Sequence, residues 1–206
     1  MAESTNNFRI ELATQNDREK IVEFLLDVFR VQEPMCRSRA VTREEVGTHF
    51  RDLANDGLKS DVSFVVFDSS GLMVACCLNE IAFPQNIQSE LQPQYQSDNV
   101  NALVNFVHSL WLNFCEKAPD VRKFLKLGII CVHPCLVRQG IATKLMQLSI
   151  DVARSKMCDS VALTATAMRS QKLFEKHGFE TLAEKKFEEL ILHDGATHGK
   201  LMLLRL

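Results

Sequence analysis

The sequence predicts a mixed α/β fold in which one central β-sheet of mixed strand directions is flanked by α-helices. Segments with the two-residue period of strands alternate with segments that have the 3.6-residue period of helices. Of the 206 residues, 46% are apolar, which is enough for one substantial core. No repeat, linker or low-complexity tract divides the chain. We therefore expect a single domain over residues 1–206.

The N-terminal part is expected to fold as a strand, two helices and a hairpin. Pro34 interrupts the first helical pattern. Thr42 and Glu45 have the spacing of a capping box at the start of the second helix, and Gly57 stands at its end. A Ser-Ser-Gly link between two apolar runs indicates the hairpin turn. The expected elements are a strand at 8–14, helices at 17–29 and 42–57, and hairpin strands at 62–68 and 72–83.

The C-terminal part begins with a polar, Gln-rich segment at 84–99 that contains two prolines and is too long for an ordinary connection. Such a segment is typical of a lid or binding loop. Alternating helices and strands are expected after it. They are a helix at 100–117, a strand at 124–134, a helix at 140–156, a strand at 160–166, a short helix ending in FEKHGFE, and strands at 181–190 and 199–206.

Composition excludes several classes of partner. The net charge is -2 and the basic residues are scattered, so no basic stripe suits nucleic acid or an anionic membrane surface. The first twenty residues lack the apolar core of a signal peptide, and no later run of about 20 apolar residues can span a bilayer. We expect a soluble, cytoplasmic protein that is a monomer or weak dimer and binds a small molecule.

The seven cysteines are an odd number and lie within apolar runs, which favours reduced, buried thiols over a disulfide framework. Cys131, His133 and Cys135 form a C-x-H-x-C cluster, but it offers only three ligands where a structural zinc site needs four. We expect no metal. Within its apolar strand, Cys131 is better explained as a small core residue than as a nucleophile.

The bend within VHPCLVRQGIATKLM, residues 132–146, joins a predicted strand to a predicted helix. Unpaired N–H groups at a helix start, with the positive end of the helix dipole behind them, form a cradle for anions. Gly140 lacks a Cβ and allows a phosphate to approach the main chain, and Arg138 adds charge at the rim. Neither G-x-x-x-x-G-K-[ST] nor G-x-G-x-x-G is present. A lone glycine at a helix start is weak evidence for a binding site, and on these residues alone a plain turn is the favoured explanation.

The same segment resembles the acyl-CoA-binding motif of the GCN5-related N-acetyltransferases (GNAT), in which V-x-P precedes [QR]-x-x-G-x-[GA]. ICVHPCLVRQGIA supplies the strand, Val132, Pro134, Gly140 and Ala142, although Val137 stands where Gln or Arg is usual. A second GNAT signature, a strand and short helix ending in K-x-G-F, is matched by VALTATAMRSQKLFEKHGF. The resemblance implies the GNAT fold, acetyl-CoA as co-substrate, and cofactor contacts from Ile130, Cys131, Val132, Val137, Arg138, Gln139, Gly140, Ile141, Ala142, Thr143 and Ser170.

Within that superfamily the chain is most similar to the invertebrate arylalkylamine N-acetyltransferases. Glu33 and Pro34 match a D/E-E-P-L-like segment, and Thr166 and Ser170 match a pair of hydroxyls four residues apart. The resemblance implies that Glu33 is the general base, with a pKa raised by partial burial. Phe174 replaces the tyrosine that many relatives use as general acid, so Ser170 or a water takes that role. Thr166 is expected to position Ser170 or a water.

The expected reaction is transfer of an acetyl group from acetyl-CoA to an arylalkylamine such as dopamine, tryptamine or serotonin by direct attack of the amine. One alternative is the same chemistry on a polyamine, an amino acid or a protein lysine, which Glu90 and Asp98 alone in the Gln-rich segment do not favour. Another is a catalytically silent acyl-CoA-binding module. Five aromatic residues are candidates for the walls of the amine pocket, namely Phe50, Phe83, Tyr95, Phe106 and Trp111.

Overall fold

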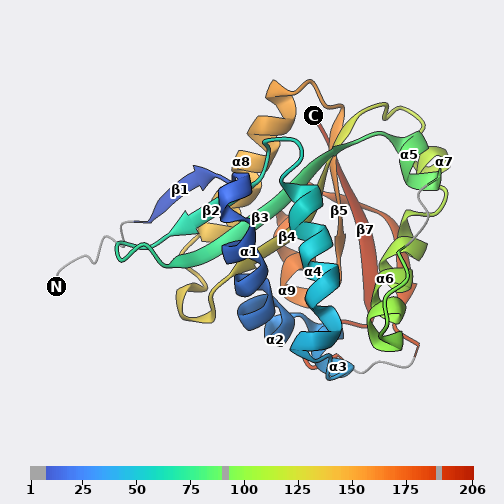
Figure 1. The fold of residues 1–206 in the computed structure, drawn as a ribbon. Helices are drawn as coiled ribbons and strands as arrows, with labels where there is room; N and C mark the ends of the chain where they lie inside the picture. The colour runs from blue at the N-terminus through green and yellow to red at the C-terminus, as the bar shows by residue number, and fades with distance from the viewer. Residues whose placement is uncertain (1–7, 90–92, 189–191) are drawn as a thin grey trace.

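The computed structural model describes residues 8–89, 93–188 and 192–206. Over these residues the fold is built around one seven-stranded β-sheet. The strand order is β1-β2-β3-β4-β5-β7-β6, and only β4 and β5 pair in parallel (Figure 1). The predicted mixed sheet is therefore confirmed. The strands are β1 Arg9–Leu12, β2 Phe64–Phe67, β3 Met73–Ala82, β4 Phe124–Val132, β5 Ser160–Ala165, β6 Glu180–Lys186 and β7 His198–Arg205.

The first predicted helix is longer and less regular than its pattern indicates. After the short turn η1 (Gln15–Asp17), α1 (Arg18–Phe24) passes into a π-helical turn, η2 (Leu25–Phe29), and then into α2 (Arg30–Gln32). Pro34 follows the end of this helical segment and also begins another short helix, α3 (Pro34–Ser38), as its first residue. The predicted capping box is confirmed: Thr42 and Glu45 exchange hydrogen bonds at the start of α4 (Arg43–Gly57).

Two predictions for the middle of the chain need correction. Segment 84–99 is not one long loop, since α5 (Pro84–Ser89) forms at its start; residues 90–92, with Glu90, lie outside the described residues. The predicted helix at 100–117 is two helices, because Asn113 takes a left-handed conformation (φ 60°) between α6 (Asp98–Trp111) and α7 (Phe114–Lys117). The remaining helices are η3 Pro134–Leu136, α8 Ile141–Ser155 and α9 Met168–Lys176.

A β-bulge in β4 places side chains on its two sides in different clusters of the hydrophobic core. Asn79 of β3 pairs with Leu127, but Leu78 pairs with Ile129, so Gly128 is one extra residue in β4. An extra residue reverses which side chains face each side of a strand. Leu127 accordingly packs in the cluster under α8, whereas Ile129 packs in the cluster under α1 and α4, which cover the opposite face (Figure 1).

The C-terminal strands form as predicted, with β6 ending at Lys186; residues 189 and 190 of the expected strand lie outside the described part of the chain. All seven cysteines are free, but Cys135 is exposed and Cys115 half-buried, so only five thiols are in the core. Within the described ranges, no helix is long and apolar enough to cross a membrane.

The bulge is fixed by a buried polar network around Asn79. Its amide nitrogen donates to the Val62 carbonyl (2.7 Å) and to Ser149 Oγ (2.9 Å), while its N–H donates to Ser63 Oγ (2.8 Å). Asn79 is 1% exposed, so its polar groups are satisfied by these partners and not by bulk water.

We therefore expect Asn79→Ala to lower the free energy of unfolding by about 2 to 3 kcal/mol, because it leaves buried polar partners unsatisfied. Urea denaturation followed by circular dichroism measures this change. Asn99→Ala, at a half-buried residue whose amide makes a single 3.5 Å contact with Glu45, is the matched control and should cost less than about 0.5 kcal/mol. Equal effects of the two substitutions would show that the network does not stabilise the bulge.

Candidate active site

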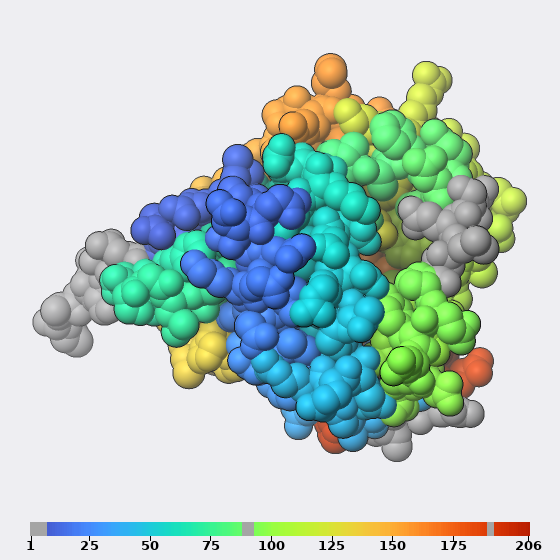
Figure 2. All heavy atoms as spheres, viewed as in Figure 1, coloured from blue at the N-terminus to red at the C-terminus, as the bar shows by residue number. Residues whose placement is uncertain are grey.

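One cleft of about 1110 Å³ contains most of the residues that the sequence singles out. It runs from the start of α8, along the gap between β4 and β5, to a chamber between α4 and α6. Figure 2 shows the surface hollowed where α4 (cyan) and α6 (green) lie side by side. A cleft of this size can hold an extended cofactor and a small acceptor together.

The two parallel strands separate in the middle of the sheet. Pairing of β4 with β5 ends at Leu127 and Leu163. Beyond this point His133 N–H donates to the Val74 carbonyl of β3 (2.8 Å). Because antiparallel pairs alternate, Ile130 and Val132 direct their main-chain groups away from β3 and toward the cleft.

Ile130, Cys131 and Val132 are all predicted to contact the cofactor. Only Ile130 and Val132 have main-chain groups that face this gap. Gln32 Nε2 lies 3.4 Å from the Val132 carbonyl, which agrees with that carbonyl facing away from β3. The same alternation pairs the Cys131 main chain with β3, so the Cys131 N–H is not available to a ligand in this gap. Its buried side chain still lines the cleft.

The turn before α8 has the shape of an anion cradle. Arg138 (φ 67°) and Gly140 (φ 77°) both adopt the left-handed conformation, and a Cβ added at Gly140 meets no atom within 4 Å. The first main-chain donor inside α8 is the N–H of Lys144, which donates to the Gly140 carbonyl. The N–H groups of residues 141–143 therefore have no acceptor within the helix. Every predicted cofactor residue except Gln139 lines the cleft.

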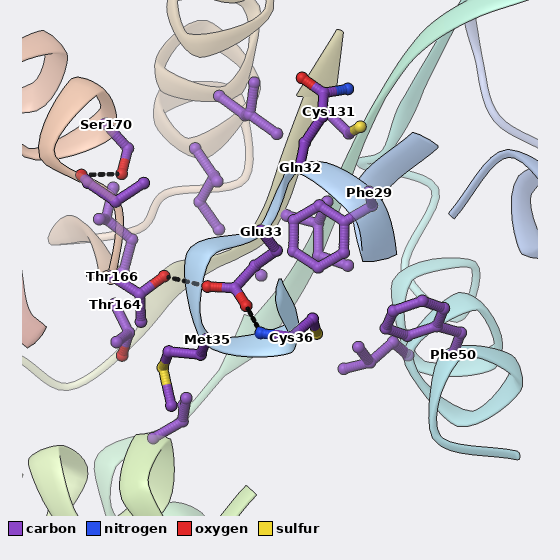
Figure 3. Close-up of a pocket in the computed structure, with 18 of the residues that line it drawn as sticks. Phe29, Gln32, Glu33, Met35, Cys36, Phe50, Cys131, Thr164, Thr166 and Ser170 are labelled. Carbon is purple, nitrogen blue, oxygen red and sulfur yellow. Dashed lines mark hydrogen bonds between the residues drawn. The ribbon is translucent and has the colours of Figure 1, made fainter. Parts of the chain in front are cut away.

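Glu33 lies in the wall of the cleft as the N-cap of α3 (Figure 3). The Cys36 N–H donates to its Oε2 (2.6 Å), and Thr166 Oγ1 donates to its Oε1 (2.9 Å). The residue is buried, and desolvation raises the pKa of its carboxyl above the ordinary value although both hydrogen bonds lower it. Glu33 is thus a carboxyl group that takes up a proton more readily than a solvated one.

The hydroxyls of Thr166, which precedes α9, and Ser170, within α9, do not bond to each other. Thr166 donates to Glu33, whereas Ser170 Oγ donates to the Ala167 carbonyl (2.7 Å), as Figure 3 shows. The sequence leads us to expect that Thr166 positions Ser170 or a water; in the structure its hydroxyl donates to Glu33 and makes no bond to Ser170. Ser170 lines the cleft one turn further along, and Phe174 is buried against Phe179.

A hydrogen-bonded group that the sequence did not indicate lies in the chamber between α4 and α6. Tyr95 Oη donates to Asp52 Oδ2 (2.9 Å) and lies 3.2 Å from His49 Nδ1. Burial lowers the pKa of His49 to about 4. His49 and Asp52 are three residues apart on α4 and so share a face, which is a signal, but nothing local indicates Tyr95 as their partner.

The aromatic candidates separate into two groups. Phe50, Tyr95 and Trp111 line the cleft. Phe106 instead stacks on Phe187 with ring centroids 4.7 Å apart, and Phe83 is 37% exposed outside the cleft lining. The chamber thus has aromatic walls. In the described part of the chain, no group of three His, Cys, Asp or Glu side chains is placed to hold a metal ion.

Comparisons with known proteins agree with this geometry. Residues 100–179 match the acetyltransferase (GNAT) family, whereas no curated protein sequence matches the chain. The fold is similar to that of arylalkylamine N-acetyltransferase 2 from Aedes aegypti (20% identity, TM-score 0.80, 97% of this chain and 99% of that one). It is also similar to a Drosophila melanogaster polyamine N-acetyltransferase that forms N-acetylagmatine (15%, 0.81, 97% and 100%).

A more distant similarity is to the NatC complex bound to a Gag peptide and CoA (16% identity, TM-score 0.60, 97% of this chain and 99% of that one). At these identities the structural similarities establish the fold and not the acceptor. The sequence match covers β4, the turn at Gly140, α8 and α9, which are the elements that build the Gly140 end of the cleft. The sequence over residues 100–179 therefore matches the acetyltransferase (GNAT) family, and the fold of the whole chain is similar to that of solved N-acetyltransferases.

Proposed function

We propose that this protein transfers the acetyl group of acetyl-CoA to the amine of a small arylalkylamine, and that the whole chain forms one catalytic domain. The observation that carries the proposal is a buried carboxyl group, Glu33, in the wall of the cleft whose other end is the anion cradle at Gly140. GNAT enzymes use acetyl-CoA. The cradle fits its pyrophosphate, because the open space at Gly140 and the N–H groups of residues 141–143 suit a bulky anion.

The cleft supplies what amine acetylation needs. An alkylamine has a pKa of about 10.4, so a base must remove its proton near neutral pH. Glu33 accepts this proton, and the lone pair that it frees on the amine nitrogen then bonds to the acetyl carbon. The N–H groups of Ile130 and Val132 donate to the carbonyl oxygen, on which negative charge develops. The carbon–sulfur bond then breaks, and the second proton that the nitrogen loses on becoming an amide passes through Ser170 or a water to the thiolate.

For Ser170 to act as the acid, its hydroxyl must leave the Ala167 carbonyl, to which it donates at 2.7 Å. This carbonyl is that of a residue three positions earlier, a local bond that a side-chain rotation breaks at little cost. Ser170 is half-buried in the cleft lining, so a rotated hydroxyl faces the ligand space.

The aromatic chamber supports an aromatic acceptor over the alternatives. Phe50 and Trp111 offer flat apolar walls. A polyamine site needs several uncompensated acidic groups. Of the carboxylates on this side of the cleft, Asp56 pairs with Lys59 and Glu80 with Lys126. This leaves Asp52, whose hydrogen-bond partner is the neutral Tyr95. A silent binding module has no need for a desolvated carboxyl held by two donors. We take the enzyme to be cytoplasmic and a monomer or weak dimer, as its sequence suggests.

Gly140→Val should weaken acetyl-CoA binding by roughly 10-fold or more, because a branched side chain enters the space where a phosphate approaches. Isothermal titration calorimetry on the folded variant measures this. Gly71 is the matched control, since it also has a positive φ (84°) and open space but lies in the hairpin turn away from the cleft. Gly71→Val should retain wild-type affinity. Equal affinity of the two variants would exclude the cradle as the binding site.

Thr166→Val should raise the pKa of Glu33 further, because it removes a donor that stabilises the ionised carboxylate. Isotope-edited infrared titration of the carboxyl group measures the pKa directly. In kinetics, the acidic limb of the kcat/KM profile should move to higher pH, since more of the base is then protonated at a given pH. An unchanged or lowered pKa would show that the Thr166 bond does not act on the carboxylate.

Glu33→Gln should lower kcat/KM for an alkylamine by about 10² to 10⁴-fold near neutral pH while acetyl-CoA still binds, because it removes the basic oxygen and keeps the shape. The deficit should shrink as pH rises, since more amine then arrives unprotonated. A thiol-release assay across pH with calorimetry of acetyl-CoA binding tests this. Wild-type rates at pH 7, or a deficit that is the same at every pH, would show that Glu33 is not the base.

A further inference from the structure

The chamber between α4 and α6 contains a hydrogen-bond chain whose direction is fixed. Tyr95 has one hydroxyl proton, and the Asp52 carboxylate can only accept it. The Tyr95 oxygen must then accept from His49, so the proton of the neutral imidazole is on Nδ1. The other ring nitrogen of His49, Nε2, is left as a hydrogen-bond acceptor.

The hydrogen-bond chain of His49, Tyr95 and Asp52 lines the same cleft as Glu33, and aromatic rings lie between the two. The Glu33 N–H donates to the Phe29 carbonyl (2.7 Å), and the Phe29 ring meets the Phe50 ring edge-on at 5.7 Å (Figure 3). Phe50 adjoins His49 on α4, and both line the cleft. An acceptor with its amine at Glu33 and its body along these rings therefore extends its far end toward His49.

We propose that His49 Nε2 accepts a hydrogen bond from a hydroxyl group at the end of the acceptor remote from the reactive amine. The site then selects ring-hydroxylated arylalkylamines over those without a ring hydroxyl. This inference rests on the proposed function. His49 is a specificity-determining residue in this account, and Tyr95 and Asp52 are positioning residues that hold its acceptor nitrogen in place.

The surroundings favour a neutral hydroxyl over a second positive charge. Burial lowers the pKa of His49 to about 4, although the charges of Asp52 and Asp56 both raise it. An environment that disfavours a proton on the imidazole also disfavours an ammonium or guanidinium group placed against it. Asp56 is already paired with Lys59, and Asp52 accepts from Tyr95. A phenolic hydroxyl needs an acceptor and brings no charge to be desolvated.

The test compares two pairs of amines on the full-length enzyme by thiol release. Tyramine and phenethylamine differ only in the ring hydroxyl, and agmatine and butylamine differ in a distal guanidinium. His49→Asn keeps a donor for Tyr95 and removes the nitrogen at the Nε2 position; His49→Gln returns an amide to that position. Tyr95→Phe releases the ring from its partner. His177→Asn is the matched control, because His177 is a half-buried histidine outside the cleft lining.

Wild-type enzyme should prefer tyramine over phenethylamine by about 3- to 10-fold in kcat/KM, mostly through KM, since one neutral hydrogen bond is at stake. His49→Asn should abolish this preference by lowering kcat/KM for tyramine more than for phenethylamine. Tyr95→Phe should reduce the preference, and His49→Gln should partly restore it. His177→Asn should leave it unchanged.

Three results would overturn the inference while leaving the proposed function in place: no tyramine preference in the wild type, an equal loss for both amines in His49→Asn, or a preference for agmatine over butylamine that His49→Asn removes. The last would identify a cation site. Absence of acetyl transfer to every amine by wild-type enzyme would instead contradict the proposed function, and this inference with it.

Discussion

The extra residue at Gly128 is the constraint on which the rest of the site depends. By adding one position to β4 opposite Leu78 and Asn79, it turns the strand away from β5 after Leu127. A strand in the middle of a sheet ordinarily uses all its main-chain groups in pairing. Here the groups of Ile130 and Val132 are released on one side, and a ligand can replace the missing strand. The Asn79 network joins the bulged part of the sheet to α8 and to the residues before β2 through buried hydrogen bonds.

Two opposing effects, which come from different parts of the fold, act on the pKa of the Glu33 carboxyl. Burial in the N-terminal helical segment raises the pKa of its carboxyl, while donors from Cys36 and from Thr166, 133 residues away in the sequence, lower it. The balance leaves a carboxylate that is oriented and still able to accept a proton. Because Thr166 follows β5, the bond to Glu33 also ties α3 to the far side of the gap opened by the bulge. Glu33 and the gap between β4 and β5 are thus fixed relative to each other.

Most of the fold could be predicted from local pattern, because strands and amphipathic helices carry their own periodicity. The capping box at Thr42 and the turn at Gly140 were also predictable, since each depends on residues within a few positions. What the sequence could not indicate depends on contacts between distant segments. The alternation that gives the Cys131 N–H to β3 follows from pairing register, and the Thr166–Glu33 and Tyr95–Asp52 bonds join segments 133 and 43 residues apart. Asn113 and the π turn at residues 25–29 were missed because their helical periodicity continues through them.

The central claim is that the gap between β4 and β5 is where the acyl donor pairs with the main chain. Residue-resolved amide hydrogen exchange by NMR, with and without acetyl-CoA, tests it most directly. Without ligand, the Cys131 amide should be protected by its pairing with β3, and the Ile130 and Val132 amides should exchange faster. Acetyl-CoA should slow exchange at Ile130, Val132 and residues 141–143 selectively. Saturating acetyl-CoA that leaves exchange at Ile130 and Val132 unchanged, while protecting another part of the chain, would contradict the account.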